Sequence, residues 1–410
     1  MPSFEFATAN RIIFGAGKLN QLQEQVKGRA KRLLLVTGKS SDAIPRVREI
    51  LSAQGIPFDE FALHGEPTVD TASEGVQLAL EHGCDMVIGL GGGSVLDAGK
   101  AIAALATNRG DVMDYLEVVG KGQALINAPL TYIAIPTTAG TGTEVTRNAV
   151  LESPAHGVKV SLRSPLMLPS IALVDPELTY SLPPAITAST GLDALTQLIE
   201  PFVSVKANPM TDAICREGMY HAARSLRRAY ENGSDQEARA GMSLASLFGG
   251  MALANSALGV VHGFAGPLGG MLHAPHGAIC AKLLPLVMEA NLKAMISREP
   301  NHPAIARYVE VAQILTGDKN ASASDGVQWL SDLVRDLNIP MLSVYGMTSE
   351  RFSEAAEKTM KASSTNGNPI VLSDEELREI LENAVLDNIL KDLIDHQDVV
   401  SLPKPKPPAQ

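Results

Sequence analysis

The sequence predicts two domains of different class, an N-terminal α/β domain built on a parallel sheet (residues 1–180) and a C-terminal helical bundle (residues 181–393). Short apolar runs rich in β-branched residues alternate with helical patterns up to about residue 174, which is typical of a parallel sheet covered on both faces. Beyond Pro184 long helical periods follow one another and no strand pattern returns. A length of 410 residues agrees with two or three domains of roughly 150 residues each.

In chain order, five apolar runs predict strands, at Arg32–Thr37, Pro57–Leu63, Asp85–Leu90, Leu130–Pro136 and Ile171–Val174. Helical patterns between these runs predict helices at Arg46–Gln54, Thr71–His82 and Val95–Ala106. Before the last strand we expect a β-hairpin over Asn148–Ser161 that turns near Pro154–Gly157. The later helical patterns cover about 186–203, 208–230, 235–257, 277–295, 301–316 and 324–337. The Pro-rich end predicts a disordered tail, residues 394–410.

Charge balance and cysteine usage limit the partners and the compartment. With 34 Lys and Arg against 45 Asp and Glu, the net charge is −11, which argues against binding to nucleic acid or to an anionic membrane. Three cysteines without C-x-x-C spacing, and no visible secretory signal, predict a reducing compartment, the cytoplasm. Residues 241–281 carry no Asp, Glu, Lys or Arg, but their Gly, Ala, Ser, Pro and His favour buried helices over a membrane span.

A glycine-rich turn, Gly91–Ser94, lies between a predicted strand and a predicted helix. Consecutive glycines let backbone N–H groups approach a ligand closely, and the start of a helix adds partial positive charge, so the turn suits a pyrophosphate. The alternative is a tight strand-to-helix turn without a ligand. The turn also lacks the G-x-G-x-x-G pattern, so it does not by itself indicate a Rossmann fold.

A second polar loop, Thr137–Glu144, follows the predicted strand Leu130–Pro136. Its hydroxyls and backbone amides occupy the carboxyl end of a strand, where ligands bind in open α/β sheets. The alternative is a loop whose threonines only cap a helix. Two such loops in one sheet favour a phosphate-bearing ligand.

A third group of candidate residues lies in the helical part. Asp193 and Gln197 are four residues apart and share a helix face, while His262 and His276 lie in the uncharged stretch. A carboxylate, an amide oxygen and two imidazoles are able to hold a divalent metal. The alternative is that both His are ordinary buried or capping residues, since this spacing is no metal signature.

Taken together, these segments resemble the iron-containing (group III) alcohol dehydrogenase family. The resemblance covers about residues 4–390 and rests, in order, on IIFGAGKLNQL, GEPT, GGGSVLDAGKAIA, PTTAGTGTEVT, VDPELT, GLDALTQLIE and HGFAGPLGGMLHAPHGAICAKLLP. It implies a nucleotide-binding α/β domain and a helical domain, the two-domain plan shared with dehydroquinate-synthase-like proteins, with the active site between the two domains.

Residue by residue, the resemblance implies a cofactor lying along Gly92, Gly93, Ser94, Thr137, Thr138, Thr141 and Lys159. The pyrophosphate is expected on the first three, and Lys159 near the ribose or nicotinamide end. The family's metal ligands are one Asp and three His, and Asp193, His262 and His276 match three of them. The resemblance thus implies one Fe²⁺ or Zn²⁺ on these residues, with Gln197 or a water in the fourth place.

Two positions depart from the family pattern. Gln197 replaces a His, and a neutral amide oxygen is a poorer ligand than imidazole, so we expect a lower metal affinity. Gly266 stands where many members have another active-site His, which removes a candidate proton relay and opens space beside the substrate. His273 is the remaining candidate for proton transfer, and a role at the rim of the pocket is the alternative.

The strand Arg32–Thr37 ends in a segment that predicts the cofactor type. Where NAD-preferring members often carry an Asp, this chain has Gly38, followed by Lys39 and Ser41. A 2′-phosphate favours such a cation and hydroxyl, so we expect NADP(H) to be preferred over NAD(H).

The predicted reaction is metal-assisted hydride transfer between the nicotinamide and a small aldehyde or alcohol. The resemblance also implies a homo-oligomer, and we expect a dimer. A maleylacetate-reductase-like enzyme is one alternative. Others are a metal-dependent lyase of the related fold and a dinucleotide-binding homologue that has lost turnover.

Overall fold

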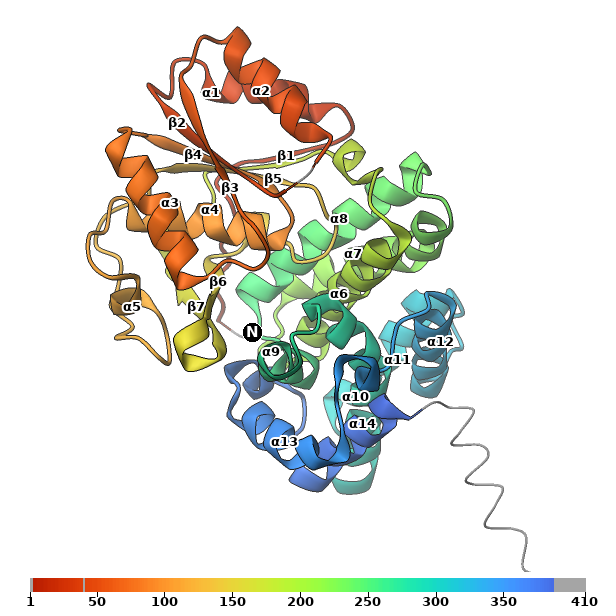
Figure 1. Cartoon of the computed structure of the whole chain (residues 1–410). Coiled ribbons are helices and arrows are strands. Elements are labelled where there is room, and N and C mark those ends of the chain that lie inside the picture. The colour runs from red at the N-terminus through yellow and green to blue at the C-terminus, as the bar shows by residue number, and fades with distance from the viewer. Residues whose placement is uncertain (1–2, 40, 387–410) are drawn as a thin grey trace, which may run out of the picture.

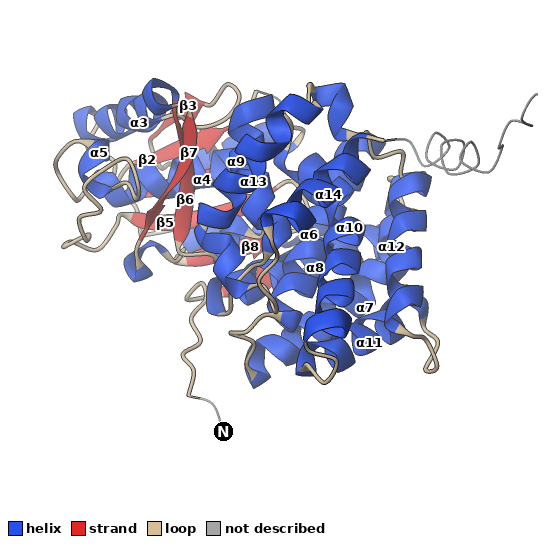
Figure 2. Ribbon diagram, turned by 90° about the horizontal axis from the view of Figure 1, so that it is seen from below, coloured by secondary structure: helices blue, strands red, loops and turns tan. Residues whose placement is uncertain are grey.

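The computed structural model describes residues 3–39 and 41–386, so the predicted tail, 394–410, lies outside the described residues. Strands and their helices form one end of the molecule, and helices alone form the other (Figures 1 and 2). The chain therefore has an N-terminal sheet domain and a C-terminal all-helical domain, as the sequence predicts.

Six parallel strands form the central sheet in the order β1-β8-β5-β4-β2-β3. Their bounds are β1 (Ile12–Phe14), β2 (Leu33–Thr37), β3 (Phe58–Ala62), β4 (Met86–Gly91), β5 (Thr131–Pro136) and β8 (Ile171–Val174). All five predicted strands are confirmed. The short edge strand β1 was not expected, because three residues are too few to show a pattern.

The register of the sheet brings the predicted ligand loops to one edge. Thr37 pairs with Leu90, and Gly91 pairs with Pro136, so β2, β4 and β5 end at the same level. From β2 the chain moves outward to β3 and then returns across β2 to β4, which makes a switch point between β2 and β4. Ligands of open α/β sheets bind at such a point, outside the carboxyl ends of the strands.

Helices cover both faces of the sheet, which explains the uninterrupted apolar strands. Leu33 and Leu35 pack in the cluster that contains Val47 of α2, whereas Leu34 and Val36 pack in the cluster of α3 and α4. The helices of this domain are α1 (Leu22–Val26), α2 (Ala43–Ala53), α3 (Val69–Glu81), α4 (Gly93–Leu105) and α5 (Val112–Tyr115).

The predicted hairpin is confirmed as the antiparallel pair β6 (Asn148–Ser153) and β7 (Val158–Arg163). A short 3₁₀ turn, Pro154–His156, joins the strands at the expected place. The hairpin packs against α4 through Ala149 and Leu151, and its tip approaches the helical domain, because a Cβ on Gly270 would lie 3.3 Å from the carbonyl oxygen of Gly157.

The helical domain consists of α6 (Pro184–Val203), α7 (Pro209–Glu231), α8 (Gln236–Asn255), α9 (Val260–Leu272), α10 (His276–Arg298), α11 (Pro303–Thr316), α12 (Ala323–Asp336), α13 (Phe352–Lys361) and α14 (Asp374–Val385). The six predicted helical segments agree with α6, α7, α8, α10, α11 and α12. Three helices, α9, α13 and α14, were not assigned from the sequence. Within the described part of the chain, no single helix is long and apolar enough to span a membrane, and α8 and α9 meet those criteria only jointly, across a 97° bend.

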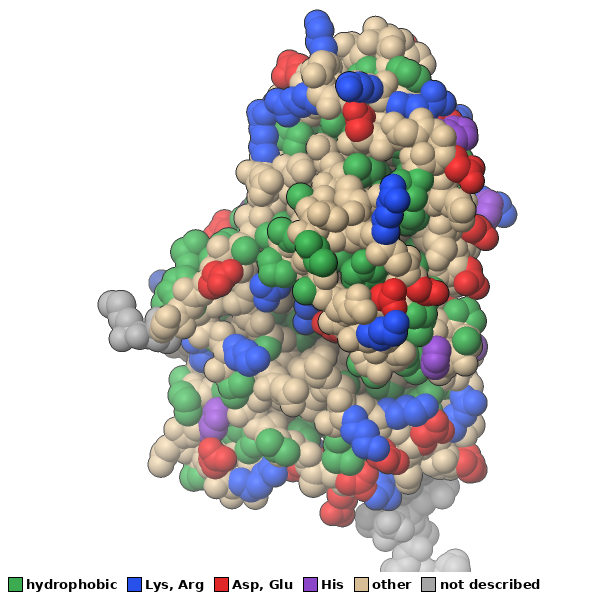
Figure 3. All heavy atoms as spheres, turned by 90° about the vertical axis from the view of Figure 1, so that its left-hand side faces the viewer, with side chains coloured by type: hydrophobic (Ala, Val, Ile, Leu, Met, Phe, Trp, Pro, Cys, Tyr) green, Lys and Arg blue, Asp and Glu red, His purple; other side chains and the backbone are tan. Residues whose placement is uncertain are grey.

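One face of the molecule is shown in Figure 3. Lys and Arg side chains are interspersed there with Asp and Glu, and apolar side chains appear between them. Among the described residues on this face, no broad field of one charge sign is present.

Candidate functional site

Three polar side chains lie on one face of α6. Asp193, Gln197 and Glu200 are four and three residues apart, a spacing that places them on the same side of the helix. Each is at most 5% exposed. Because the rest of this helix face packs in the apolar core of the domain, each of these polar groups needs a partner.

His262 of α9 is held in place by Glu200. Its Nδ1 lies 2.7 Å from Glu200 Oε2, and the backbone N–H of Val261 donates to Glu200 Oε1 at 2.7 Å. Because a carboxylate accepts here, we assign the ring proton to Nδ1, which leaves the lone pair of Nε2 free. Asp193 Oδ1 lies 3.5 Å from that nitrogen.

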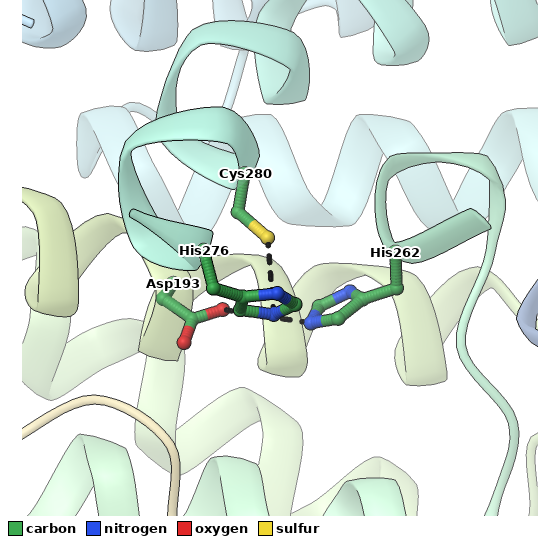
Figure 4. A group of neighbouring side chains, drawn as sticks. All are labelled: Asp193, His262, His276 and Cys280. Atoms are coloured by element: carbon green, nitrogen blue, oxygen red, sulfur yellow. Dashed lines mark hydrogen bonds and ion pairs between the residues drawn. The ribbon is translucent and has the colours of Figure 1, made fainter. Parts of the chain in front are cut away.

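The helix α10 adds two more side chains, since His276 and Cys280 share a face at positions i and i+4. His276 Nε2 lies 3.8 Å from Asp193 Oδ1 and 3.6 Å from Cys280 Sγ. Figure 4 shows the side chains of Asp193, His262, His276 and Cys280 converging from three helices, and one ligand atom of each lies within 4.8 Å of the others. The side chain of His276 is 41% exposed, so the group is open to solvent on this side.

Several buried atoms in this group lack a hydrogen-bond partner, namely Asp193 Oδ1, Gln197 Oε1 and His262 Nε2. An unsatisfied buried polar atom costs about 1–3 kcal/mol, so three of them close together are unusual. Carboxylate oxygen, imidazole nitrogen and thiol sulfur are common ligands of Fe²⁺ and Zn²⁺. The residues present therefore fit a divalent cation.

The electrostatics of the group also favour a cation. Burial raises the pKa of Asp193, but the nearby His276 and His262 outweigh this effect and lower it. Burial lowers the pKa of His276, but Cys280 and Asp193 outweigh that effect and raise it to about 9. The negative charge of Asp193 and Cys280 therefore stabilises a positive charge between these side chains by more than burial destabilises it.

The two ligand loops predicted in the sheet domain lie against each other. A Cβ on Gly92 would lie 3.3 Å from Thr138 Cγ2, and a Cβ on Gly93 only 2.7 Å from Thr141 Cγ2. Glycine is thus required at position 93 by the close approach of the loop that contains Thr141. Thr137, which is 9% exposed, is tied to the turn because its N–H donates to the carbonyl oxygen of Gly91 at 2.9 Å.

Ser94 and Lys159 are brought together by an acidic residue that the sequence did not single out. Ser94 Oγ donates to Glu66 Oε2 at 3.1 Å, and Lys159 Nζ lies 3.4 Å from Glu66 Oε1. Ser94 is in the first turn of α4, so Lys159 of the hairpin lies beside the start of this helix.

The three residues predicted to select the cofactor follow β2 at the switch point. A Cβ on Gly38 would meet Val95 Cγ2 at 3.5 Å, an ordinary contact, so Gly38 lies beside the start of α4 with room for a side chain. Lys39 is exposed, and Ser41 Oγ accepts from the N–H of Ala43 at 3.2 Å.

The threonine loop also contacts the helical domain. A Cβ on Gly140 would lie 2.7 Å from Thr190 Cβ, which places this loop against α6 one turn before Asp193. Gly142 has a φ of +59°, and a Cβ there would lie 2.5 Å from the Cα of Gly250 in α8. The loop is therefore in contact with the glycine-rich turn on one side and with the helix of Asp193 on the other.

Beneath this loop, the fully buried Lys100 makes a set of hydrogen bonds that the sequence analysis missed. Its Nζ donates to the carbonyl oxygens of Thr143, Thr146 and Asn148 at 2.7, 2.9 and 2.8 Å, and lies 3.0 Å from Thr146 Oγ1. Asp97, one turn earlier on α4, accepts from Thr143 Oγ1 at 3.2 Å and from the N–H of Val150 at 3.1 Å.

Burial shifts the pKa values of the charged groups in this region. It lowers the pKa of Lys100 to about 8 and raises the pKa of Asp97 to about 6, although each group partly offsets the effect on the other. The neighbouring Glu144, which is 2% exposed, has a pKa raised to about 7 by burial.

The structure does not bring His273 into the group of side chains around Asp193. His273 ends α9 with a φ of +50° and is exposed.

Gly266 is on α9, four residues after His262, and a Cβ there would meet nothing within 4 Å, in line with the open space expected at this position.

Two residues of the site, Glu200 and Cys280, were missed although the sequence carried a signal for each. Glu200 lies seven residues after Asp193, and Cys280 lies four residues after His276, so helical spacing alone places each beside a candidate ligand. Cys280 was considered only as evidence on the redox compartment.

Comparison with known proteins gives matches along nearly the whole chain. The model of the iron-containing alcohol dehydrogenase family matches residues 9–176, and the model of the C-terminal part of the Fe-containing alcohol dehydrogenase family matches residues 187–385. Alcohol dehydrogenase 4 of Schizosaccharomyces pombe is 35% identical over 391 residues, which cover 94% of this chain and 90% of that protein.

Solved structures show the same fold. A 1,3-propanediol oxidoreductase is 32% identical and superposes with a TM-score of 0.86, covering 93% of this chain and 100% of its own. A sulfoacetaldehyde reductase from Bifidobacterium kashiwanohense, solved in complex with NAD⁺, is 27% identical with a TM-score of 0.83, covering 94% of this chain and 99% of its own.

Proposed function

The chain belongs to the iron-containing alcohol dehydrogenase family and is an oxidoreductase of the alcohol dehydrogenase type, and we propose that it transfers hydride between NADP(H) and a small aldehyde or alcohol. One observation carries the proposal: the threonine loop contacts both the glycine turn and the helix that bears Asp193. A dinucleotide bound along this loop would extend from the turn towards the candidate metal ligands. Hydride transfer needs both parts, whereas a plain dinucleotide binder needs no metal.

Asp193, His262 and His276 would hold one divalent ion, Fe²⁺ or Zn²⁺, near the reacting end of the cofactor. Such an ion supplies the positive charge that polarises a carbonyl oxygen. Glu200 orients the ring of His262 by accepting from Nδ1, which keeps Nε2 available as a ligand.

The sheet domain would bind the phosphates through its backbone. The start of α4 offers free N–H groups and partial positive charge, and Gly92 and Gly93 allow close approach. Lys159 lies beside this helix start in an ion pair with Glu66, and would meet the ribose or nicotinamide end of the cofactor. His273 is exposed and is not one of the four grouped ligand residues, so proton delivery through it stays a prediction.

The preference for NADP(H) is the finer part of the proposal. Gly38 offers no carboxylate to repel a 2′-phosphate, and Lys39 is exposed beside it. We expect Gly38→Asp to shift the ratio of kcat/KM values towards NAD(H), since the position has room for a Cβ. Steady-state kinetics with both cofactors tests this, with Lys31→Ala, an exposed lysine before β2, as the control. A wild-type KM lower for NADH than for NADPH would refute the preference.

The reaction itself is tested by following cofactor absorbance with a panel of short and long aldehydes, ketones and alcohols. We expect reversible turnover with at least one small aldehyde, and Gly266→Leu should reduce activity on the longer substrates more than on the shortest one, because it fills open space. Absence of any absorbance change across the panel would refute the proposal and favour a binding protein.

We further propose a homodimer in the cytoplasm. The family resemblance suggests the dimer, and the three free cysteines, all buried, fit a reducing compartment. Light scattering after size exclusion should give twice the chain mass of 43.3 kDa. A monomeric mass would overturn the dimer.

A further inference from the structure

We propose that Cys280 Sγ, and not Gln197, completes the ligand set of the cation. The donors would then be one carboxylate oxygen, two imidazole nitrogens and one thiolate, a set that favours zinc over iron(II). The inference rests on the cation site put forward under the proposed function and names the fourth ligand of this particular chain.

Distances between the ligand atoms support this set. Ligands at about 2.0–2.3 Å from a tetrahedral zinc are roughly 3.3–3.8 Å from one another. The structure gives 3.5 Å from His262 Nε2 to Asp193 Oδ1, 3.8 Å from His276 Nε2 to the same oxygen, and 3.6 Å from that nitrogen to Cys280 Sγ. Three of the six separations thus have tetrahedral spacing, and all four atoms lie within 4.8 Å of one another.

Gln197 fits the fourth place less well. Its side chain lies against α8, since a Cβ on Gly249 would lie 3.2 Å from Gln197 Cβ and 3.4 Å from Gln197 Oε1. That oxygen is buried and without a partner, but it is also a neutral and weak donor to zinc.

The other buried cysteines show what is special about Cys280. Burial raises the pKa of the Cys84 thiol to about 11, and burial also raises that of Cys215. Neither belongs to a group of metal-ligating side chains among the described residues, whereas Cys280 lies beside His276 and within 4.8 Å of two further ligand atoms.

Binding through sulfur has a defined chemical balance. The S–H bond of Cys280 breaks, its proton goes to solvent, and the electron pair left on sulfur forms the bond to the cation without any change of oxidation state. Four protein ligands remain compatible with catalysis, because zinc sites expand to five ligands during reactions.

The test replaces the native ion with Co²⁺ in the full chain and records the near-ultraviolet spectrum, where a thiolate bound to Co²⁺ gives a charge-transfer band. We expect the band in the wild-type protein and in Cys215→Ser, a matched buried cysteine, and not in Cys280→Ser. Competition with a chelator should show zinc affinity about 10-fold weaker or more in Cys280→Ser, and within about threefold of wild type in Gln197→Ala.

Elemental analysis after anaerobic exposure to equal Zn²⁺ and Fe²⁺ should show a lower zinc-to-iron ratio in Cys280→Ser than in wild type. A wild-type cobalt spectrum without the band would overturn the assignment of Cys280, even if the variant fails to fold. Wild-type protein that binds neither Co²⁺ nor Zn²⁺ would overturn the cation site itself. If the wild-type protein shows the band but turns over no aldehyde, the proposed reaction is refuted, while the assignment of Cys280 as a ligand stands.

Discussion

Two buried polar groups lie near the threonine loop, and they differ in whether the protein satisfies them by itself. In the sheet domain, the Lys100 group (Asp97, Lys100, Thr143 and Thr146) is closed by hydrogen bonds of 2.7–3.2 Å. In the helical domain, the His262 group (Asp193, Gln197, His262, His276 and Cys280) leaves three buried atoms without a partner.

The difference separates a structural role from a ligand-binding role. The Lys100 ammonium meets four oxygen atoms of the loop and the hairpin, so its hydrogen bonds fix the position of the loop. The His262 group has ligand atoms 3.5 and 3.8 Å apart, and three of its buried atoms have no partner within the protein. A buried polar group that the protein leaves unsatisfied is thus the stronger sign of function.

The largest effect should come from removing the carboxylate of the His262 group. We expect Asp193→Ala to lower kcat by several orders of magnitude, because stabilisation of developing charge is usually the largest catalytic contribution. The Kd for the dinucleotide, measured by fluorescence titration, should stay nearly unchanged, because the loops proposed to bind it lie in the other domain. Wild-type turnover in this variant would show that the His262 group has no ligand-binding role in catalysis.

In the Lys100 group the effect should be on stability. We expect Lys100→Met to lower the free energy of unfolding by about 3–5 kcal/mol, because several buried loop oxygens lose their donor and the buried Asp97 loses a nearby positive charge. Denaturant unfolding measures this, with Lys121→Met as the control, since Lys121 forms an exposed ion pair with Asp114, a kind of pair that contributes little to stability. A loss below about 1 kcal/mol for Lys100→Met would contradict a structural role.

A weaker effect is expected from Glu200, which supports His262. Glutamine offers one acceptor oxygen where Glu200 now accepts from both His262 Nδ1 and the N–H of Val261, so Glu200→Gln should weaken metal affinity by about 10–100-fold. Chelator competition measures it. Glu217→Gln is the matched control, because Glu217 contacts His221 at 3.2 Å on the surface. Equal affinities in the two variants would argue against Glu200 as a positioning residue.

The smallest effect concerns pH. The folded-state pKa of Glu144 is about 7, above its ordinary value of 4.5. Because the folded protein holds this proton more tightly than the unfolded chain, the free energy of unfolding falls as pH rises from about 4.5 through 7. Glu144→Gln removes this slope. Its stability relative to wild type should therefore increase by roughly 1 kcal/mol between pH 6 and pH 8. Denaturant unfolding at both pH values checks it, and a difference independent of pH would refute the raised pKa.

The sequence predicted the parts of the fold that have strong local patterns. Leu33–Thr37 and Met86–Gly91 are uninterrupted apolar runs and were found as strands. The short β1 carries too little pattern, and α14 was missed although Ser373 and Glu376 form a capping box that marks its start. The domain boundary near residue 180 stays a prediction; β8 ends at Val174 and α6 begins at Pro184.

The candidate site could be predicted only in part. The types and order of Asp193, His262 and His276 were available from the resemblance, and the structure brings them together. Helical spacing places Glu200 and Cys280 on the same faces as Asp193 and His276, but only the packing of α10 against α6 and α9 shows that these faces meet. The bonds of Lys100 to the loop connect residues more than 40 positions apart, which no local pattern encodes.

The placement of the candidate ligands along the chain has a consequence for the denatured state. His262, His276 and Cys280 lie within one short segment, whereas Asp193 comes from a distant helix. An unfolded chain can therefore still chelate zinc through two imidazoles and a thiolate. Since any affinity of the unfolded chain reduces the stabilisation by a ligand, added zinc should raise the melting temperature less than its affinity for the folded protein implies.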